Sequence, residues 1–260
     1  MNSTEIHRIY NAILAAEREG AELIMHAHGI LTQEKSGHRD VVTEYDKKVQ
    51  ALIVERMKQT VPGACFFCEE SMVQDDLHAE HLFVIDPIDG TMNFVKGFNH
   101  SCTSVAYLYK GELTAAAIYD PYMDEMFSAI KGEGAWLNGN PIHASEQPLS
   151  DNVFEFGSSP YDSVLSERAF RLAKTAFDNS LDLRRGASAA LDLAFIAAGR
   201  AGLFFELALS YWDYAAGLLI VQEAGGICST IDGTPLPMDA SRTSVLAGGR
   251  QCYADFRSLI

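Results

Sequence analysis

The chain has 260 residues, of which 48% are hydrophobic and 21% charged, so it can bury a sizeable core and a mainly disordered chain is excluded. Its 35 acidic and 20 basic residues give a formal charge of −15, which argues against direct contact with nucleic acid or an anionic membrane. No apolar run approaches the roughly 18 residues of a membrane span, the start lacks the basic and apolar parts of a signal peptide, and five cysteines suit reduced thiols, so we expect a cytoplasmic protein.

Two amphipathic helices are expected at the start of the chain. Apolar residues recur at helical spacing over residues 2–29, and a second helix should begin at Thr43 and end before Pro62. Two short apolar runs, 64–68 and 82–85, follow and predict buried strands.

The middle of the chain changes to a strand pattern. Residues 103–109, 113–119 and 126–129 are separated by short turn signals, so they predict an antiparallel meander. Asn138-Gly139 is a strong signal for a two-residue hairpin turn.

Helices and strands alternate after about residue 152. Mixed strands and layered helices indicate an α/β (α+β) sandwich. We expect a single domain over 1–260, with an N-terminal lobe of about 1–150 and a C-terminal lobe of about 151–260. The expected elements are strands at 153–156, 202–206 and 227–230, and helices at 163–177, 188–199 and 212–224.

The most informative segment is Asp86-Pro87-Ile88-Asp89-Gly90-Thr91. A buried strand presents Asp86 at its carboxyl end, where ligands bind in sheets flanked by helices, and Asp89 follows across a tight turn. Two carboxylates this close repel each other, and a divalent cation with oxygen ligands removes that conflict. The amides of Gly90 and Thr91 would suit a phosphate oxygen if they open a helix. The alternative is an Asp-rich turn that caps a helix.

Three further acidic positions have an ordinary and a functional interpretation. Glu69 follows an apolar run, where an acidic pair is usually a solvated face. Asp213 stands at the start of a helix, where an Asp is usually a cap. Thr43 and Asp46 have the spacing of a capping box, although Asp46 could also orient a water molecule together with Thr91.

Several segments, taken in their order along the chain, resemble the inositol monophosphatase family of Mg²⁺-dependent, lithium-sensitive phosphatases. The resemblance covers nearly the whole chain and implies a five-layered αβαβα sandwich of the inositol monophosphatase/fructose bisphosphatase type and a homodimer. Met92 departs from the family pattern, which commonly has a second Thr there, and Ala187 stands where Gly is frequent. The segments that carry the resemblance are 69–71, 86–91, 185–190, 212–217 and 223–226.

The resemblance also implies a metal site with two to three Mg²⁺ ions. Glu69, Asp86 and the backbone carbonyl of Ile88 would hold the first ion. Asp86, Asp89 and Asp213 would hold the second, and Glu69 would share a third, weaker ion.

Roles in catalysis and substrate binding follow from the same resemblance. Thr91 and Asp46 would activate the attacking water, with Glu69 as a further catalytic residue. The polar segment 35–39 would form a flap over the metals, with Lys35 near the site. The expected substrate contacts are Asp89, Gly90, Thr91, Ala189 and Glu206.

The expected reaction is hydrolysis of a small phosphomonoester, with inositol 1-phosphate as the first candidate, by direct attack of metal-activated water. Two alternatives stay open: a 3′-nucleotide or sugar (bis)phosphatase of the same superfamily, and a non-catalytic regulatory binding protein, for example a partner of the transcription machinery. A zinc site at Cys65 and Cys68 is disfavoured because His78 and His81 lie at a poor spacing, so that segment predicts a core strand.

Overall fold

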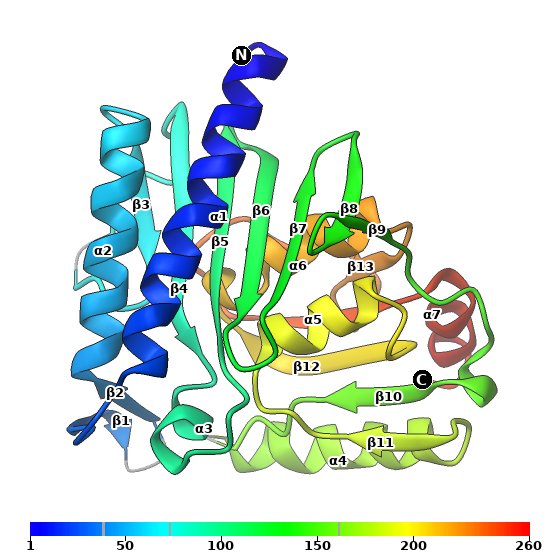
Figure 1. Cartoon of the computed structure of the whole chain (residues 1–260). Coiled ribbons are helices and arrows are strands. Elements are labelled where there is room, and N and C mark those ends of the chain that lie inside the picture. Colours follow the sequence, from blue (N-terminus) through cyan, green and yellow to red (C-terminus); the bar gives the residue numbers. More distant parts are fainter. Residues whose placement is uncertain (38–39, 73, 161) are drawn as a thin grey trace.

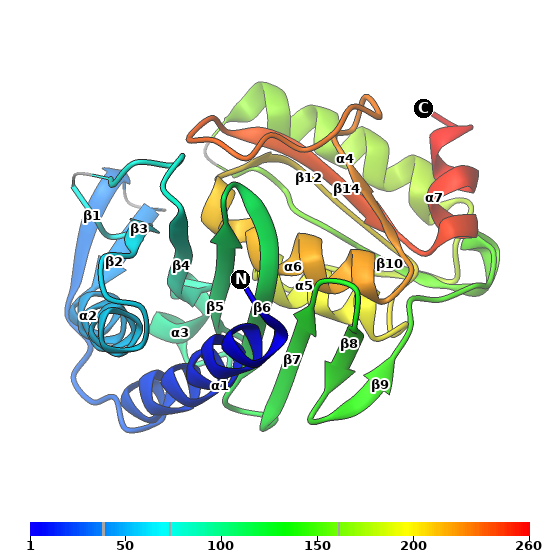
Figure 2. The same cartoon turned by 90° about the horizontal axis from the view of Figure 1, so that it is seen from above.

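Five layers of helices and sheets alternate across the structure, a computed structural model that describes residues 1–37, 40–72, 74–160 and 162–260 (Figures 1 and 2). Two helices pack on one face of a seven-stranded sheet, and two more lie between this sheet and a five-stranded sheet, whose outer face carries the last pair. The predicted αβαβα sandwich is therefore confirmed. In this layer order the helices are α1 (Ser3–Met25) and α2 (Glu44–Thr60), α5 (Ala189–Ala197) and α6 (Tyr211–Glu223), and α4 (Ser163–Phe177) and α7 (Arg250–Arg257).

The seven-stranded sheet follows the chain order without a crossover. Its first two strands are parallel and every later neighbour is antiparallel, as the predicted meander and the Asn138-Gly139 turn require. In order the strands are β3 (Cys65–Cys68), β4 (His81–Asp89), β5 (Cys102–Tyr109), β6 (Glu112–Asp120), β7 (Glu125–Ile130), β8 (Gly134–Leu137) and β9 (Asn140–Ile142).

The five-stranded sheet has the order β11-β10-β12-β14-β13 and mixes parallel and antiparallel pairs. Its central strand, β12, delivers Glu206 and then Ser210, which precedes α6. Its strands are β10 (Val153–Phe156), β11 (Asp182–Arg184), β12 (Leu203–Leu209), β13 (Ile227–Ser229) and β14 (Thr243–Gly248).

Four short elements connect these layers: β1 (Thr32–Gly37), β2 (Asp40–Thr43), α3 (Thr91–Lys96) and the 3₁₀ helix η1 (Leu149–Asp151). The segment 35–39 was expected to be a loop, but its first three residues continue strand β1, and His38 and Arg39 lie outside the described residues. The prediction of a flap there stays a prediction. Among the described residues, no helix is both long and apolar enough to cross a membrane.

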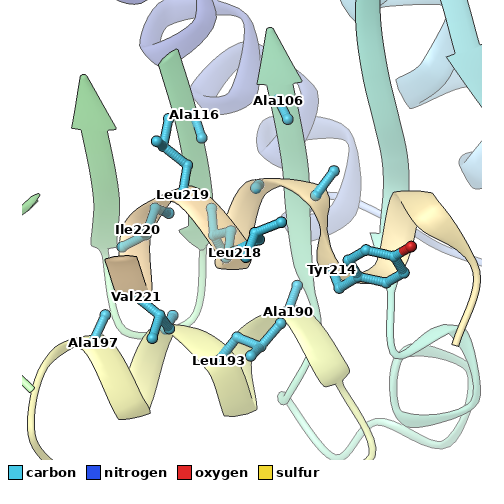
Figure 3. Close-up of a cluster of buried hydrophobic side chains, with 14 of the residues drawn as sticks. Ala106, Ala116, Ala190, Leu193, Ala197, Tyr214, Leu218, Leu219, Ile220 and Val221 are labelled. Atoms are coloured by element: carbon cyan, nitrogen blue, oxygen red, sulfur yellow. The ribbon is translucent and has the colours of Figure 1, made fainter. Parts of the chain in front are cut away.

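The central helices form the core between the two sheets. Helix α6 is apolar on nearly all sides because one side meets the large sheet, at residues such as Ala106 and Ala116, and another meets α5 (Figure 3). Gly217 allows the close approach of the two helices, since a Cβ there would lie 2.6 Å from Cβ of Leu193. This packed layer holds the starts of α5 and α6 in fixed positions beside β4.

Candidate active site

A bulge in β4 places two aspartates together. Asp86 and Asp89 are three residues apart, so a regular strand would turn their side chains to opposite faces. Strand β4 extends to Asp89, four residues beyond the predicted end, and its pairing with β5 shifts register between these two residues. Pro87 lies inside the shift, where its missing N–H costs no ladder bond.

Asp86 lies at the centre of an acidic cluster. The residue is 2% exposed, and its Oδ1 accepts the N–H of Ile88 at 3.1 Å. The pKa of Asp86 is raised well above its usual range, first by burial and then by the charges of Glu69, Asp89 and Asp213. The other three predicted acidic metal ligands therefore all act on the carboxyl group of Asp86.

Glu69 reaches the cluster because β3 runs parallel to β4. Cys68 pairs with Ile85, and the N–H of Glu69 donates to the carbonyl of Ile85 at 3.1 Å. This register sets Glu69 beside Asp86. Its position at the end of a core strand is also what the interpretation of 64–68 as a strand predicts, and among the described residues Cys65 and Cys68 belong to no metal-binding group.

Asp89 is fixed from the other side by the start of α5. Its Oδ2 accepts the hydroxyl of Ser188 at 2.6 Å and the N–H of Ala190 at 2.7 Å. Burial raises the pKa of Asp89, and these hydrogen bonds oppose that shift. No role was expected for Ser188, although a serine at the start of a predicted helix is a signal for such a contact.

Asp213 caps a helix and also lies in the acidic cluster. Its Oδ2 accepts the N–H of Ser210 at 2.7 Å and completes a capping box at the start of α6. The pKa of Asp213 is also raised well above its usual range by burial and by the charges of Asp89 and Glu69. The helix cap thus holds a carboxylate in the cluster.

Thr91 and Asp46 meet beside the same cluster. The Thr91 hydroxyl lies 3.2 Å from Oδ1 of Asp46 and 3.1 Å from the carbonyl of Ile88, and its single proton can go to either. Asp46 is buried and is held by its capping box, in which its Oδ2 accepts the N–H of Thr43 at 2.7 Å and the Thr43 hydroxyl at 2.5 Å. The structural and the functional interpretation of Asp46 are compatible.

Gly90 makes the turn from β4 into α3. Its φ of 88° lies in the left-handed region, and a Cβ there would lie 3.0 Å from the carbonyl oxygen of His100. No side chain among the described residues caps the first turn of α3. Asn93, to which no role was assigned, joins this helix to two other segments by donating to the carbonyls of His100 at 2.7 Å and Gly186 at 2.8 Å.

The two predicted contacts to substrate hydroxyls come from the C-terminal half. Ala189 is the first residue of α5, next to the anchor of Asp89. Burial raises the pKa of Glu206 to about 7, and its charge acts on Asp213. Gly157 leaves room for Glu206, since a Cβ at Gly157 would lie 2.0 Å from its carboxyl group.

The donor set is chemically suited to a hard divalent cation. Four carboxylates and the carbonyl of Ile88 are oxygen ligands of the kind that Mg²⁺ takes, and a cation would relieve the repulsion that helps to raise the pKa values of Asp86 and Asp213. As the side chains stand, no three acidic, histidine or cysteine groups of the described residues close tightly enough around one point to hold an ion. Ion binding would therefore require the carboxylates to come closer together.

Comparison with known proteins agrees with this architecture. The profile described as "Inositol monophosphatase family" matches residues 5–257. The chain therefore belongs to the inositol monophosphatase family.

Individual relatives and solved structures are also similar to this chain. The chain is 38% identical over 239 residues to a protein named Nus factor SuhB from Vibrio cholerae, which covers 88% of this chain and 87% of the relative. The crystal structure of the extragenic suppressor protein suhB from Bartonella henselae matches with a TM-score of 0.90 at 29% identity, covering 96% of this chain and 97% of that one. An inositol monophosphatase/NADP phosphatase, solved with Mg²⁺ and phosphate, matches with a TM-score of 0.81 at 25% identity, covering 93% and 89%.

Proposed function

We propose that this protein is a Mg²⁺-dependent phosphatase of small phosphomonoesters, with inositol 1-phosphate as the first substrate to test. The observation that carries the proposal is the meeting of Glu69, Asp86, Asp89 and Asp213 beside the Thr91–Asp46 pair. The relative solved with Mg²⁺ and phosphate supports the choice of metal and of chemistry.

The ligand assignment keeps the expected pattern. Glu69, Asp86 and the carbonyl of Ile88 would hold one ion, and Asp86, Asp89 and Asp213 a second. When bound, these ions lower the pKa of a water molecule and neutralise phosphate charge. A third, weaker ion at Glu69 remains part of the proposal.

The chain's own groups then guide the reaction. With its proton donated to Asp46, the Thr91 hydroxyl can accept a hydrogen bond from the attacking water and align it. The N–H groups of Gly90 and Thr91 bind phosphate oxygens at the start of α3. No serine, cysteine or histidine nucleophile takes part, so no phosphoenzyme forms.

Substrate hydroxyls would bind at Ala189 and Glu206. A carboxyl group with a pKa of about 7 is partly ionised at neutral pH and can accept a hydrogen bond from a hydroxyl. This chemistry suits a polyol or sugar leaving group. A 3′-nucleotide or sugar (bis)phosphatase is the alternative within the same superfamily.

The direct test is phosphate release from a panel of inositol, sugar and nucleotide monophosphates, with and without Mg²⁺ and with added lithium. We expect release that requires Mg²⁺, falls with lithium and is fastest with a polyol phosphate. Preference for a 3′-nucleotide would select the alternative substrate class. Absence of Mg²⁺-dependent release from every compound would refute the enzymatic proposal.

A second candidate function rests on the relatives named Nus factor SuhB. We infer that a protein partner in a transcription complex is compatible with this chain, while its charge of −15 disfavours direct contact with RNA. Co-elution of the protein and of its Asp89→Asn variant with purified RNA polymerase and transcription factors tests this. Co-elution of both would show a role that is independent of catalysis.

We also propose a homodimer in the cytoplasm, as the family resemblance implies. Light scattering should give twice the chain mass of 28.5 kDa. A monomer at micromolar concentration would contradict the dimer.

A further inference from the structure

Two buried polar atoms that have no hydrogen-bond partner among the described residues lie beside the candidate active site but take no part in the proposed reaction. They are Nε2 of His100 and Oδ1 of Asp192. Asp192 is 1% exposed, and a buried carboxylate oxygen without a partner is costly. Both atoms therefore need a hydrogen-bond partner, and the proposed metal and phosphate chemistry does not supply one.

The backbone position of Gly186 shows that Nε2 of His100 and Oδ1 of Asp192 lie close to the same point. A Cβ at Gly186 would lie 2.5 Å from Nε2 of His100 and 2.6 Å from Oδ1 of Asp192. The φ of Gly186 is outside the left-handed region, so the backbone does not require glycine here, and the reason for glycine is space. The imidazole and the carboxylate therefore both border the volume that any side chain at this position would fill.

The electrostatic surroundings favour a donor at His100. Asp192 faces the charges of Glu155, Asp89 and Glu206, which with burial raise its pKa well above the usual range, and Arg185 opposes them only in part. Burial raises the pKa of Asp89 and of Asp120, and His100 is one of the groups that oppose this rise. An imidazole N–H is thus placed among carboxylates.

The backbone around this pair belongs to the segments that hold Asp89. Asn93 donates to the carbonyls of both His100 and Gly186. Two residues beyond Gly186, Ser188 donates to Asp89 and precedes α5, which carries Asp192. A link between His100 and Asp192 therefore ties the segment after α3 to the start of α5.

We propose that His100 and Asp192 form an imidazole–carboxylate pair across Gly186, directly or through one water molecule, and that this pair positions the start of α5 and with it Asp89. A cavity of about 860 Å³, lined in part by Asn93, His100 and Gly186, lies beside the proposed pair. Neither residue touches substrate or metal in this scheme, so both are positioning residues. The role in metal binding rests on the proposed function.

The first test compares four variants by Mg²⁺ dependence of phosphate release: His100→Phe, Asp192→Leu, their combination and His100→Gln. We expect each of the two single losses to raise the half-saturating Mg²⁺ concentration about tenfold, as loss of a partner of a metal ligand does. The double variant should be no worse than either single one, and the substrate KM should change less than twofold. Gln places an amide N–H near the position of Nε2, so His100→Gln should restore most of the loss.

Additive losses in the double variant, or a His100→Gln variant no better than His100→Phe, would overturn the pair. The exposed His143 supplies the control, and His143→Phe should behave as the wild type.

The second test needs no activity. Chemical unfolding of the metal-free wild type, His100→Phe, Asp192→Leu and the double variant measures the coupling of the two residues. Gly186→Ala drives a methyl group between them and should destabilise the protein, whereas the smaller side chain in His100→Ala/Gly186→Ala should recover part of that loss. Additive unfolding energies without recovery would refute the pair even in an active enzyme. Coupling in a protein that hydrolyses no phosphomonoester would refute the proposed function and leave the pair standing.

Discussion

Buried carboxyl groups occur in two different settings in this molecule. Glu17 lies alone under α1, fully buried against the seven-stranded sheet, and neither of its oxygens has a hydrogen-bond partner among the described residues. Burial raises its pKa well above the usual range, and Arg18 and the nearby backbone N–H of Val105 oppose this only in part. Asp86 is almost equally buried, but its pKa is raised by three further carboxylates as well.

The difference shows that the consequence of burying a carboxyl group depends on whether other carboxyl groups lie close to it. A lone buried acid lowers its free energy by keeping a proton. Four acids that act on one another can instead share a divalent cation, provided that folding holds them together. Replacing the carboxyl group by an amide should therefore increase the stability of the protein at Glu17 and remove its activity at the cluster. Variants at the cluster and at Glu17 test this contrast.

Asp89→Asn should produce the largest change. The amide cannot replace a carboxylate that serves as a metal ligand, so we expect phosphate release to fall by about 1000-fold or more while the protein stays folded. Rates and circular dichroism spectra measure the two parts. Asp178→Asn, at the exposed end of α4, is the matched control and should keep full activity. Normal turnover by Asp89→Asn at ordinary Mg²⁺ would remove Asp89 from the site.

Thr91→Val should have the next largest effect. Valine keeps the shape but cannot align water, so we expect kcat to fall by roughly 100-fold or more with little change in Mg²⁺ binding. Steady-state kinetics at saturating Mg²⁺ checks this, with Thr175→Val, at a half-buried position on α4, as control. A loss that appears in Mg²⁺ affinity instead of kcat would assign Thr91 to the metal site.

Asp213→Asn should reduce stabilisation by Mg²⁺. Mg²⁺ at ten times its Kd stabilises the wild type by about 1.4 kcal/mol, which a thermal melting series detects. The asparagine can still accept the Ser210 N–H, so the fold survives while most of the shift in Tm disappears. Glu17→Gln should keep the full shift. An equal Mg²⁺ shift in Asp213→Asn and the wild type would contradict the assignment of Asp213.

Glu17→Gln should give the smallest effect and the opposite sign. Since the folded-state pKa of Glu17 is raised, folded protein keeps a proton that the unfolded chain loses above its ordinary pKa, and stability falls as the pH rises. The variant lacks this loss, so we expect little difference near pH 4 and a gain of about 1–3 kcal/mol at pH 8. Urea unfolding at both pH values measures it, and Glu22→Gln, exposed on the same helix, is the control. A loss of stability at pH 8 would show that Glu17 is ionised and paired.

Local signals in the sequence predicted much of the site. Asp86 and Asp89 share one short segment, the spacing of Thr43 and Asp46 predicts the observed capping box, and the resemblance over distant segments predicted the sandwich. All of these depend on residues that are close in the chain or on a pattern already known as a whole.

Features that depend on tertiary contacts could not be predicted in this way. The bulge in β4 arises from its pairing with β5, and the strand continues to Asp89 because that partner is present. The role of Ser188 depends on a hydrogen bond across 99 positions of the chain. Strand β14 was missed because its short apolar run becomes a strand only between β12 and β13. Helix α7, which packs on β14, was missed with it.

Crystals grown with Mn²⁺ in place of Mg²⁺, measured at the manganese absorption edge, test the central claim most directly. The account predicts two strong anomalous peaks, one bound by Glu69, Asp86 and the Ile88 carbonyl and one bound by Asp86, Asp89 and Asp213. Absence of peaks at saturating Mn²⁺, or peaks bound only by other residues, would contradict it.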